Sequence, residues 1–349
     1  MNKEMISRFK GCLLGGAIGD ALGAPVEFDT LQTIFKNTGG KGVTGFMPCY
    51  GGIGKITDDT QMSLFTGEAL IRAYFAQGRT NKDWYLTANG TGLLRWYKTQ
   101  DERYPMDRYS GLLAERRLFA RRAPGATCMS AIRAMLSTTQ FANNNSKGCG
   151  TVMRMAPVGL FAHSTAAIDS FSMGWNFSAQ THGHPTGYIA GGAFAYLIER
   201  LADGTNMLEA VLYTMGHIKD SNGHEETHAA LNLAVNLFLA QEAPETAIKK
   251  LGQGWIAEEA LGIAVYCALM AHDFRHGVLM AVNHDGDTDS TGSMTGNVLG
   301  VVHGVEALPA EWLAELELAD VIEQQAEDLA MCASWTQDSE GAQRYYVNY

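Results

Sequence analysis

Two segments of the chain carry glycine at every fourth position. The first contains Gly11, Gly15, Gly19 and Gly23, and the second contains Gly292, Gly296, Gly300 and Gly304. On a helix, residues four apart lie on one face, so each set forms a stripe without side chains. Two such stripes allow helices that are distant in sequence to pack almost backbone to backbone, with axes within about 10 Å. Both segments contain charged or polar residues, which argues against a pair of membrane helices. We therefore expect this helix pair at the centre of a globular fold.

The rest of the sequence also favours helices. Alternation of apolar and polar residues, which marks half-buried strands, is nearly absent, and the chain has only eight prolines. Residues 20–56 are rich in glycine and are predicted to be irregular. Helical spacing predicts helices, in chain order, over residues 4–19, 57–77, 81–99, 110–121, 126–138, 151–161, 165–180, 185–202, 206–219, 225–240, 244–251, 256–271, 274–283, 290–305 and 310–333.

Neither charge nor composition shifts sharply along the chain, and no linker or fixed-period repeat is present. We therefore expect one compact all-α domain over residues 1–349. Within it, the motif-bearing core spans about residues 6–305, and a C-terminal helix and tail span 310–349.

Composition excludes several classes of function. Hydrophobic residues make up 46% and charged residues 18% of the 349 positions, as in a globular rather than a disordered chain. The formal net charge of −11 argues against a general nucleic-acid binder. No apolar run is long enough for a membrane helix, so no membrane partner is expected. The six cysteines are scattered without a Cys-x-x-Cys pair, which favours free thiols and a cytoplasmic location.

The segment Asn283–Gly292 contains a dense run of oxygen donors, namely Asp285, Asp287, Asp289, Ser290 and Thr291. Carboxylates this close repel each other unless a cation lies among them, and hard oxygen donors suit Mg²⁺, Mn²⁺ or Ca²⁺ rather than zinc. An EF-hand loop is excluded, because its twelfth position would be Val298 or Gly296 instead of a glutamate. By itself, the segment is equally compatible with a surface turn and with a metal site.

A second acidic cluster lies over Thr57–Thr60, which has the sequence Thr-Asp-Asp-Thr. Its simplest interpretation is a helix N-terminus, where such residues cap the helix and face the positive end of its dipole. Glu27, in an irregular segment, is a third acid. Brought together with Asp287, Asp289 and Ser290, these residues supply enough oxygen atoms for two hard cations, which can orient a substrate diol and activate water.

Other chemistries have less support. Zinc could use some of five histidines, but only His182 and His184 have a spacing near that of ligands, and neither has a cysteine nearby in sequence. A serine hydrolase lacks its Gly-x-Ser-x-Gly elbow, and the His-Asp pairs at 272–273 and 284–285 give only slight support to a metal phosphohydrolase. We expect His182 to donate a hydrogen bond to a ligand instead.

The loop Asn143–Gly150 is the other candidate ligand surface. Its glycines permit a close approach of the backbone, and its amides can hold a phosphate. It matches neither the Walker A pattern nor a dinucleotide fingerprint. From spacing alone, a plain flexible loop is equally compatible.

Five motifs in order along the chain resemble those of the ADP-ribosylglycohydrolase family, of the type that activates dinitrogenase reductase. They are Gly11–Phe28, Thr57–Met62, Lys147–Pro157, Thr181–Pro185 and Gly286–Gly292. The resemblance covers about residues 6–305 and implies an all-helical domain with two Mg²⁺ or Mn²⁺ ions at the bottom of a cleft.

The resemblance also implies roles for individual residues. The implied metal ligands are Thr57, Asp58, Asp59, Asp287, Asp289 and Ser290, the last of which stands where many members carry threonine. Glu27 is expected beside the metals, with Glu27 or Asp58 as the catalytic base, whereas Asp285 is expected outside the ligand set. The implied substrate-binding residues are Arg108, Ser110, Gly111, Gly148, Cys149, Gly150, Met153, Arg154 and His182.

The implied reaction is hydrolysis of the bond between the anomeric carbon of ADP-ribose and a protein side chain, most readily arginine. The partner would be an ADP-ribosylated protein, and the enzyme would reset a regulated target or act as an immunity protein against an ADP-ribosylating toxin, itself a candidate partner. Two alternatives stay open. One is hydrolysis of serine-linked or O-acetyl-ADP-ribose, and the other is a non-catalytic protein of the same fold that binds ADP-ribose or a toxin.

Overall fold

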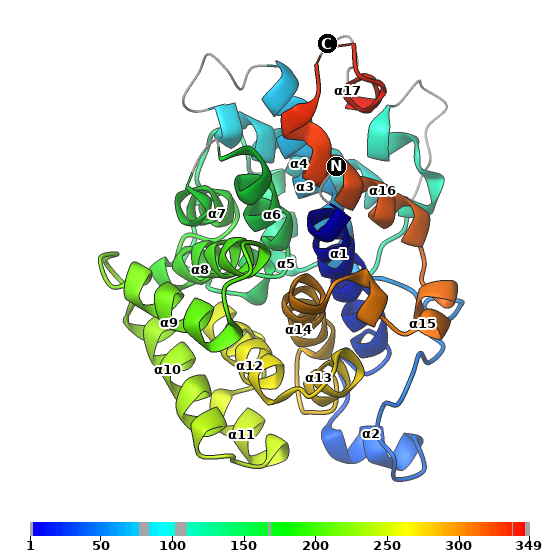
Figure 1. The fold of residues 1–349 in the computed structure, drawn as a ribbon, viewed down its shortest axis with the longest axis vertical. Coiled ribbons are helices and arrows are strands. Elements are labelled where there is room, and N and C mark those ends of the chain that lie inside the picture. Colours follow the sequence, from blue (N-terminus) through cyan, green and yellow to red (C-terminus); the bar gives the residue numbers. More distant parts are fainter. Residues whose placement is uncertain (1–2, 77–83, 102–109, 167–168, 337, 346–349) are drawn as a thin grey trace.

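The structure, a computed structural model, describes residues 3–76, 84–101, 110–166, 169–336 and 338–345. Over these ranges the chain is mostly helical (Figure 1), and the β-type pairings are two isolated bridges, Cys49 with Gly52 and Gly148 with Ile256. The all-α fold class expected from the sequence is therefore confirmed. None of the described helices is both long and apolar enough to cross a membrane.

The α-helices of the described residues are, in chain order, α1 (Lys3–Gly23), α2 (Leu31–Asn37), α3 (Asp58–Ala76), α4 (Trp84–Thr99), α5 (Ala126–Arg133), α6 (Ala156–Thr165), α7 (Ser170–Ala179), α8 (Pro185–Ala202), α9 (Met207–Ile218), α10 (Glu225–Leu239), α11 (Pro244–Leu251), α12 (Ala257–Met270), α13 (Phe274–Ala281), α14 (Thr288–His303), α15 (Ala310–Glu315), α16 (Ala319–Met331) and α17 (Glu340–Tyr345). Short 3₁₀ segments are η1 (Gly111–Ala114), η2 (Arg116–Leu118), η3 (Cys149–Thr151), η4 (Val305–Ala307) and η5 (Cys332–Ser334).

Helices α1 and α14 lie side by side in the middle of the molecule (Figure 1) and meet along their glycine stripes. A Cβ atom placed on Gly19 would lie 1.9 Å from the carbonyl oxygen of Gly292, and one on Gly15 would lie 2.5 Å from that of Gly296. Since real Cβ atoms do not approach so closely, only glycine allows this packing. The predicted backbone-to-backbone pairing of the two stripes is confirmed.

The other helices surround this pair. Helices α8 and α12 pack against α14, whereas α16 packs against α1, and α3 packs against both α4 and α6. One apolar cluster runs from Phe9 on α1 to Cys332 in η5 and includes side chains from most helices between them. This continuity supports the proposal that residues 1–349 form one domain. The six cysteines are free, as expected.

The sequence predictions differ from the structure at four places. The helix expected over residues 151–161 is shifted, since residues 149–151 form η3 and α6 spans Ala156–Thr165. Helix α2 interrupts residues 20–56, which were expected to be irregular. Residues 110–121 form the short η1 and η2 instead of a helix, because the backbone of Glu115 between them is extended, with a ψ of 104°. Residues 310–333 form two helices, because Leu318 adopts a left-handed conformation with a φ of 61°.

Candidate metal centre

Three distant segments bring their acidic side chains to one place, where α1, α3 and α14 meet. The buried polar residues there are Glu27 from the turn after α1, Thr57, Asp58 and Asp59 from the start of α3, and Asp287, Asp289 and Ser290 from the start of α14. Oxygen atoms of Glu27, Asp287 and Asp289 all lie within 4.8 Å of one another. The charge of Asp58 acts on Glu27, and the charges of Asp287 and Asp289 act on Asp59. We call these carboxylates, together with Thr57 and Ser290, the acidic centre.

Asp20 of α1 holds the first turn of α3 in place. Both of its carboxylate oxygens accept from the Thr57 amide at 3.0 Å, and one also accepts from the amide and hydroxyl of Thr60 at 3.2 and 2.5 Å. Asp58 is held separately, since it accepts from the amide of Gly125 at 3.1 Å. The Thr57 hydroxyl caps the helix by accepting from the Asp59 amide at 3.3 Å. A carboxylate on another helix therefore sets the direction in which the α3 acids point.

The start of α14 is fixed by its contacts with α1 and with the segment before α12. The hydroxyl of Thr288 donates to the carbonyl oxygen of Gly23 at 3.0 Å, at the end of the glycine stripe. The amide of Asp287 donates to the carbonyl oxygen of Gln253 at 2.8 Å. These contacts place the two aspartates of α14 opposite Glu27, which follows Gly23 by four residues.

Asp285 lies outside the acidic centre, as expected. Its carboxylate accepts from the amide of Leu31 at 2.6 Å, at the first residue of α2. This contact, from a helix amide to a carboxylate, is a helix cap supplied by another segment.

The acidic centre is electrostatically unfavourable without a cation. Burial, together with the neighbouring Asp289 charge, raises the pKa of Glu27 to about 10. Burial first and the Asp289 charge second also raise the pKa values of Asp58, Asp59 and Asp287 well above their ordinary range. In the described part of the chain, no lysine or arginine forms an ion pair with these carboxylates.

The residues present fit a hard divalent cation. Three carboxylate oxygens of the acidic centre are buried and lack any hydrogen-bond partner, namely Glu27 Oε2, Asp59 Oδ1 and Asp287 Oδ2. Unpaired buried oxygens are costly, and a cation would satisfy them. The donors are carboxylates and hydroxyls, the ligands that Mg²⁺ and Mn²⁺ prefer.

The predicted Gly148–Gly150 loop borders the acidic centre. A strap of residues 253–256 joins the two, because Gln253 accepts from Asp287 while Trp255 accepts from the Cys149 amide at 3.1 Å. Within the strap, a Cβ on Gly254 would lie 3.3 Å from the Cβ of Asp287. The structure therefore brings the loop and the acids together.

His182 and Arg154 lie beneath this loop, and each is at most 1% exposed. Cβ atoms on Gly148 and Gly150 would each meet the His182 ring at 3.3 Å, so the glycines leave room for it. Arg154 donates to the carbonyl oxygen of Gly150 at 3.0 Å and to the Thr181 hydroxyl at 2.8 Å. Both side chains support the loop on its buried side, and their part in substrate binding stays a prediction.

Met153 is buried too, and its sulfur lies 4.0 Å from the hydroxyl of Ser290. It therefore touches the acidic centre itself, on the side of the Gly148–Gly150 loop.

The structure does not bring Ser110 and Gly111 to the acidic centre. Gly111 lies against Glu68, because a Cβ there would meet the Glu68 carboxylate at 2.0 Å. Glu68 is ten residues beyond Asp58 on α3, which is about 15 Å along a helix. The third predicted residue of this segment, Arg108, lies outside the described residues.

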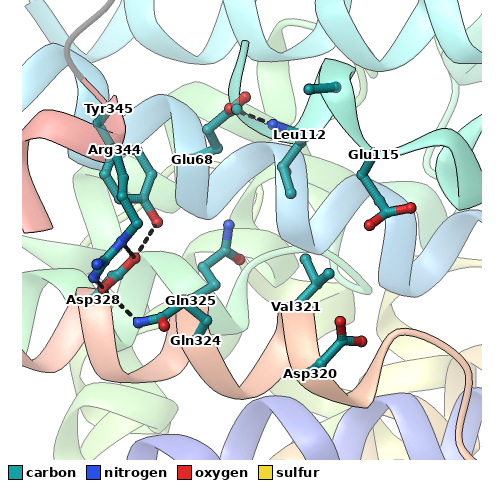
Figure 2. A pocket seen from close by; sticks show the side chains of 12 residues that line it. Glu68, Leu112, Glu115, Asp320, Val321, Gln324, Gln325, Asp328, Arg344 and Tyr345 are labelled. Carbon is teal, nitrogen blue, oxygen red and sulfur yellow. Dashed lines mark hydrogen bonds and ion pairs between the residues drawn. The ribbon is translucent and has the colours of Figure 1, made fainter.

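Gly111 and Glu68 instead line a separate pocket of about 500 Å³ between η1, α16 and α17 (Figure 2). In it, Asp328 of α16 accepts from the hydroxyl of Tyr345 at 2.8 Å and from the guanidinium of Arg344 at 2.5 Å. These contacts anchor α17 on the fold through Arg344 and Tyr345.

Sequence reasoning missed two features around the acidic centre. The first is the role of Asp20 in holding the first turn of α3, because in the sequence Asp20 is only a single charge within an apolar, glycine-rich segment. The aromatic pair Phe28 and Trp255, with ring centroids 5.9 Å apart, was not found because its members are 227 positions apart. Phe28 is 76% exposed although it follows Glu27 directly, so the pair forms part of the rim of the acidic centre.

Comparison with known proteins agrees with these observations. A model of the ADP-ribosylglycohydrolase family matches residues 1–338. An ADP-ribosylarginine hydrolase, Tri1, of Serratia proteamaculans is 25% identical over 93% of this chain and 80% of its own length. The ADP-ribosyl-dinitrogen reductase glycohydrolase of Rhodospirillum rubrum is 25% identical over 89% of this chain and 90% of its own.

A solved structure described as an ADP-ribosylglycohydrolase-related protein complex superposes with a TM-score of 0.68. It is 24% identical and covers 95% of this chain and 99% of that one, a likeness that speaks for the fold alone. Because the family model spans nearly all of the sequence, the chain belongs to the ADP-ribosylglycohydrolase family.

Proposed function

We propose that this protein removes ADP-ribose from modified arginine side chains of proteins, with two Mg²⁺ or Mn²⁺ ions in the acidic centre. The observation that carries the proposal is the buried convergence of Glu27, Asp287 and Asp289 oxygens within 4.8 Å, without a basic partner in the described chain. The resemblance to an ADP-ribosylarginine hydrolase supports arginine as the acceptor.

The residues that would hold the cations are Thr57, Asp58, Asp59, Asp287, Asp289 and Ser290. When bound, the cations supply charge that holds the two ribose hydroxyls and makes water more acidic. The remaining chemistry falls to the protein. Glu27 has one carboxylate oxygen without a partner beside the centre, and it would take the proton of the attacking water. The Gly148–Gly150 loop would line the phosphate site, because its glycines permit a close approach of the ligand.

The rim of the acidic centre supports a cationic acceptor. A guanidinium group stacks favourably on exposed aromatic rings, and the Phe28–Trp255 pair offers such a surface next to Glu27. The leaving arginine would therefore lie between an aromatic face and buried carboxylates, and both attract a positive group.

The deciding experiment measures release of ADP-ribose from arginine-linked, serine-linked and O-acetyl-linked substrates, with and without Mg²⁺ or Mn²⁺. We expect cation-dependent release from the arginine-linked substrate, and loss of at least about 100-fold in Glu27→Gln and Asp289→Asn, the scale of general-base catalysis. Release from the serine-linked or the O-acetyl-linked substrate alone would show that arginine is not the acceptor. A protein that binds cation and ADP-ribose but releases none from any substrate would be a binding protein on this fold.

A further inference from the structure

The loop that borders the acidic centre pairs with the strap of residues 253–256 over a very short length. A single antiparallel bridge joins Gly148 to Ile256. Just beyond it, the amide of Ala257 donates to the carbonyl oxygen of Lys147 at 2.8 Å. Two strands that pair alone are only marginally stable. The loop therefore depends on side chains for a fixed position.

The side chain of Lys147 provides such an anchor, because it reaches the first turns of two other helices. Its ammonium group forms ion pairs with Glu226 of α10, at 2.7 Å, and with Glu258 of α12. Glu226 also accepts a hydrogen bond from the hydroxyl of Thr186 on α8 at 2.6 Å. Lys147 thus connects the loop to the starts of three helices.

Glu258 is the buried partner of Lys147. It is 7% exposed, and within the described residues its one ion pair is with Lys147. Its Oε2 atom is buried and has no hydrogen-bond partner. Because a buried carboxylate without its cation is costly, this pair holds the lysine side chain firmly in place.

The next residue of α12, Glu259, holds the other end of the strap. Its Oε2 atom accepts from the amides of Gln253 and Gly254 at 2.9 and 3.2 Å. The carbonyl oxygen of Gln253 in turn accepts from the amide of Asp287 at 2.8 Å. Two successive glutamates therefore act on different parts of the site, Glu258 on the loop and Glu259 on the segment that holds Asp287.

We propose that the first turn of α12 positions these two parts separately. Lys147 and Glu258 are positioning residues for the loop Gly148–Gly150 and thus for ADP-ribose, whereas Glu259 positions Asp287 and thus the cations. Each of the three acts through another group and not by touching the substrate. The inference rests on the proposed function, because it takes the loop as part of the ADP-ribose site and Asp287 as a cation ligand.

The experiment measures the two affinities one after the other in the full-length protein. Calorimetry gives the dissociation constant of Mn²⁺ and then, at saturating Mn²⁺, that of ADP-ribose. We expect Lys147→Met to weaken ADP-ribose binding by about tenfold, the scale of one lost charged hydrogen bond, and to leave Mn²⁺ binding unchanged. Glu259→Ala should weaken Mn²⁺ binding by about tenfold or more, the scale of changes around metal ligands, and leave ADP-ribose binding unchanged at saturating Mn²⁺.

Kinetics add a readout that a general loss of structure would not give. At saturating Mn²⁺, Lys147→Met should raise KM for the arginine-linked substrate by about tenfold with kcat unchanged. Lys147→Arg should restore most of the affinity, because a guanidinium group can pair with both glutamates. Lys147→Met combined with Glu258→Gln removes the unpaired buried charge, so this double variant should show the same KM even where the single variant folds poorly.

The matched control is Glu225→Gln, which removes a charge from the same turn of α10 as Glu226 but at an exposed position beside it. Both affinities should stay at the wild-type values in this variant.

The outcomes separate the two proposals. If the wild type releases ADP-ribose while Lys147→Met and the double variant bind ADP-ribose as tightly as it does, the inference is overturned and the proposed function stands. Equal losses of both affinities in Lys147→Met and in Glu259→Ala would also overturn it, because the two parts would then not be positioned separately. A wild-type protein that binds neither Mn²⁺ nor ADP-ribose would overturn the proposed function and the inference with it.

Discussion

The carboxylate of Asp20, on α1, accepts hydrogen bonds from both the amide and the hydroxyl of Thr60, in the first turn of α3. Asp20 is fully buried, so this contact joins two helices inside the core. It means that the acids of α3 are aimed by a residue that is not itself among the proposed ligands. The glycine stripe of α1 joins α1 to α14, and Asp20 joins α1 to α3. Helix α1 thus connects the three helices whose ends form the acidic centre.

Loss of the Asp20–Thr60 contact should reduce both stability and cation affinity. Asp20→Ala leaves two buried amides and a hydroxyl without an acceptor, and each such group costs about 1–3 kcal/mol. We therefore expect a loss of at least about 3 kcal/mol in the free energy of unfolding, measured in urea, and weaker Mn²⁺ binding by calorimetry. A double-mutant cycle of Asp20→Asn with Thr60→Val should give a coupling of about 0.5–3 kcal/mol. Additive effects of these two changes would contradict a direct role of the contact.

Removing one acid from the centre should have opposite effects without and with cation. In a chelator, Asp59→Asn should be more stable than the wild type by about 1 kcal/mol, because one crowded buried carboxylate is gone. With Mn²⁺ at about 100 times the dissociation constant, the wild type should gain about 2.7 kcal/mol and the variant much less.

Thermal unfolding with chelator and with Mn²⁺ tests whether the variant is the more stable protein in chelator and the less stable one with Mn²⁺. Asp285→Asn is the control, because Asp285 lies next to the same segment but bonds to Leu31 instead of the centre, and it should gain as much as the wild type. If Asp59→Asn is less stable than the wild type in both buffers, the carboxylates of the acidic centre do not destabilise the cation-free protein by repulsion.

The glycine stripes should tolerate no side chain at their contact. In Gly19→Ala the new Cβ would lie 1.9 Å from the Gly292 carbonyl oxygen, so α1 and α14 would have to separate. We expect little folded protein, or a loss well above the 1–3 kcal/mol of ordinary overpacking. Gly216→Ala, on the exposed face of α9 with nothing within 4 Å, should gain about 0.5–1 kcal/mol instead. Circular dichroism and urea unfolding of the two variants test this contrast.

The sequence predicts those parts of the fold whose cause is local. The pairing of α1 and α14 was predictable because four-residue glycine spacing is a property of each helix alone. Helix α2 was not, because the acceptor for its first amide is the Asp285 side chain, 254 positions away. The break between α15 and α16 also depends on distant groups. There the amide of Glu317 donates to the carbonyl oxygen of Gly54 at 2.9 Å.

The acidic centre follows the same division. The acids of α3 and α14 could be named from their motifs, because each motif also starts a helix. The role of Asp20 and the contact of the Cys149 amide with Trp255 depend on how α1, η3 and the strap of residues 253–256 pack, which no local pattern encodes. Ser110 and Gly111 lie apart from the acidic centre for a related reason. Their motif match was loose, and the backbone of Gly111 fits beside Glu68, far along α3.

His182 should make the protein sensitive to mild acid. Burial, with a smaller contribution from the Arg154 charge, lowers the pKa of His182 to about 3. An unfolded histidine titrates near 6.5, so as pH falls the unfolded chain takes up a proton that the folded protein refuses. The stability contributed by neutral His182 is thus complete above about pH 6.5 and decreases between pH 6.5 and 3. At pH 5 the loss from this group is about 2 kcal/mol.

Urea unfolding at pH 7 and pH 5, in chelator, should therefore show a loss that is about 2 kcal/mol smaller in His182→Gln than in the wild type. His272→Gln, at an exposed position with a side chain 69% accessible, is the control and should lose as much as the wild type. Because each variant is compared with itself at two pH values, packing defects that glutamine introduces at position 182 cancel. An equal loss in all three proteins would mean that the His182 ring becomes protonated within the folded protein, which its position beneath Gly148 and Gly150 argues against.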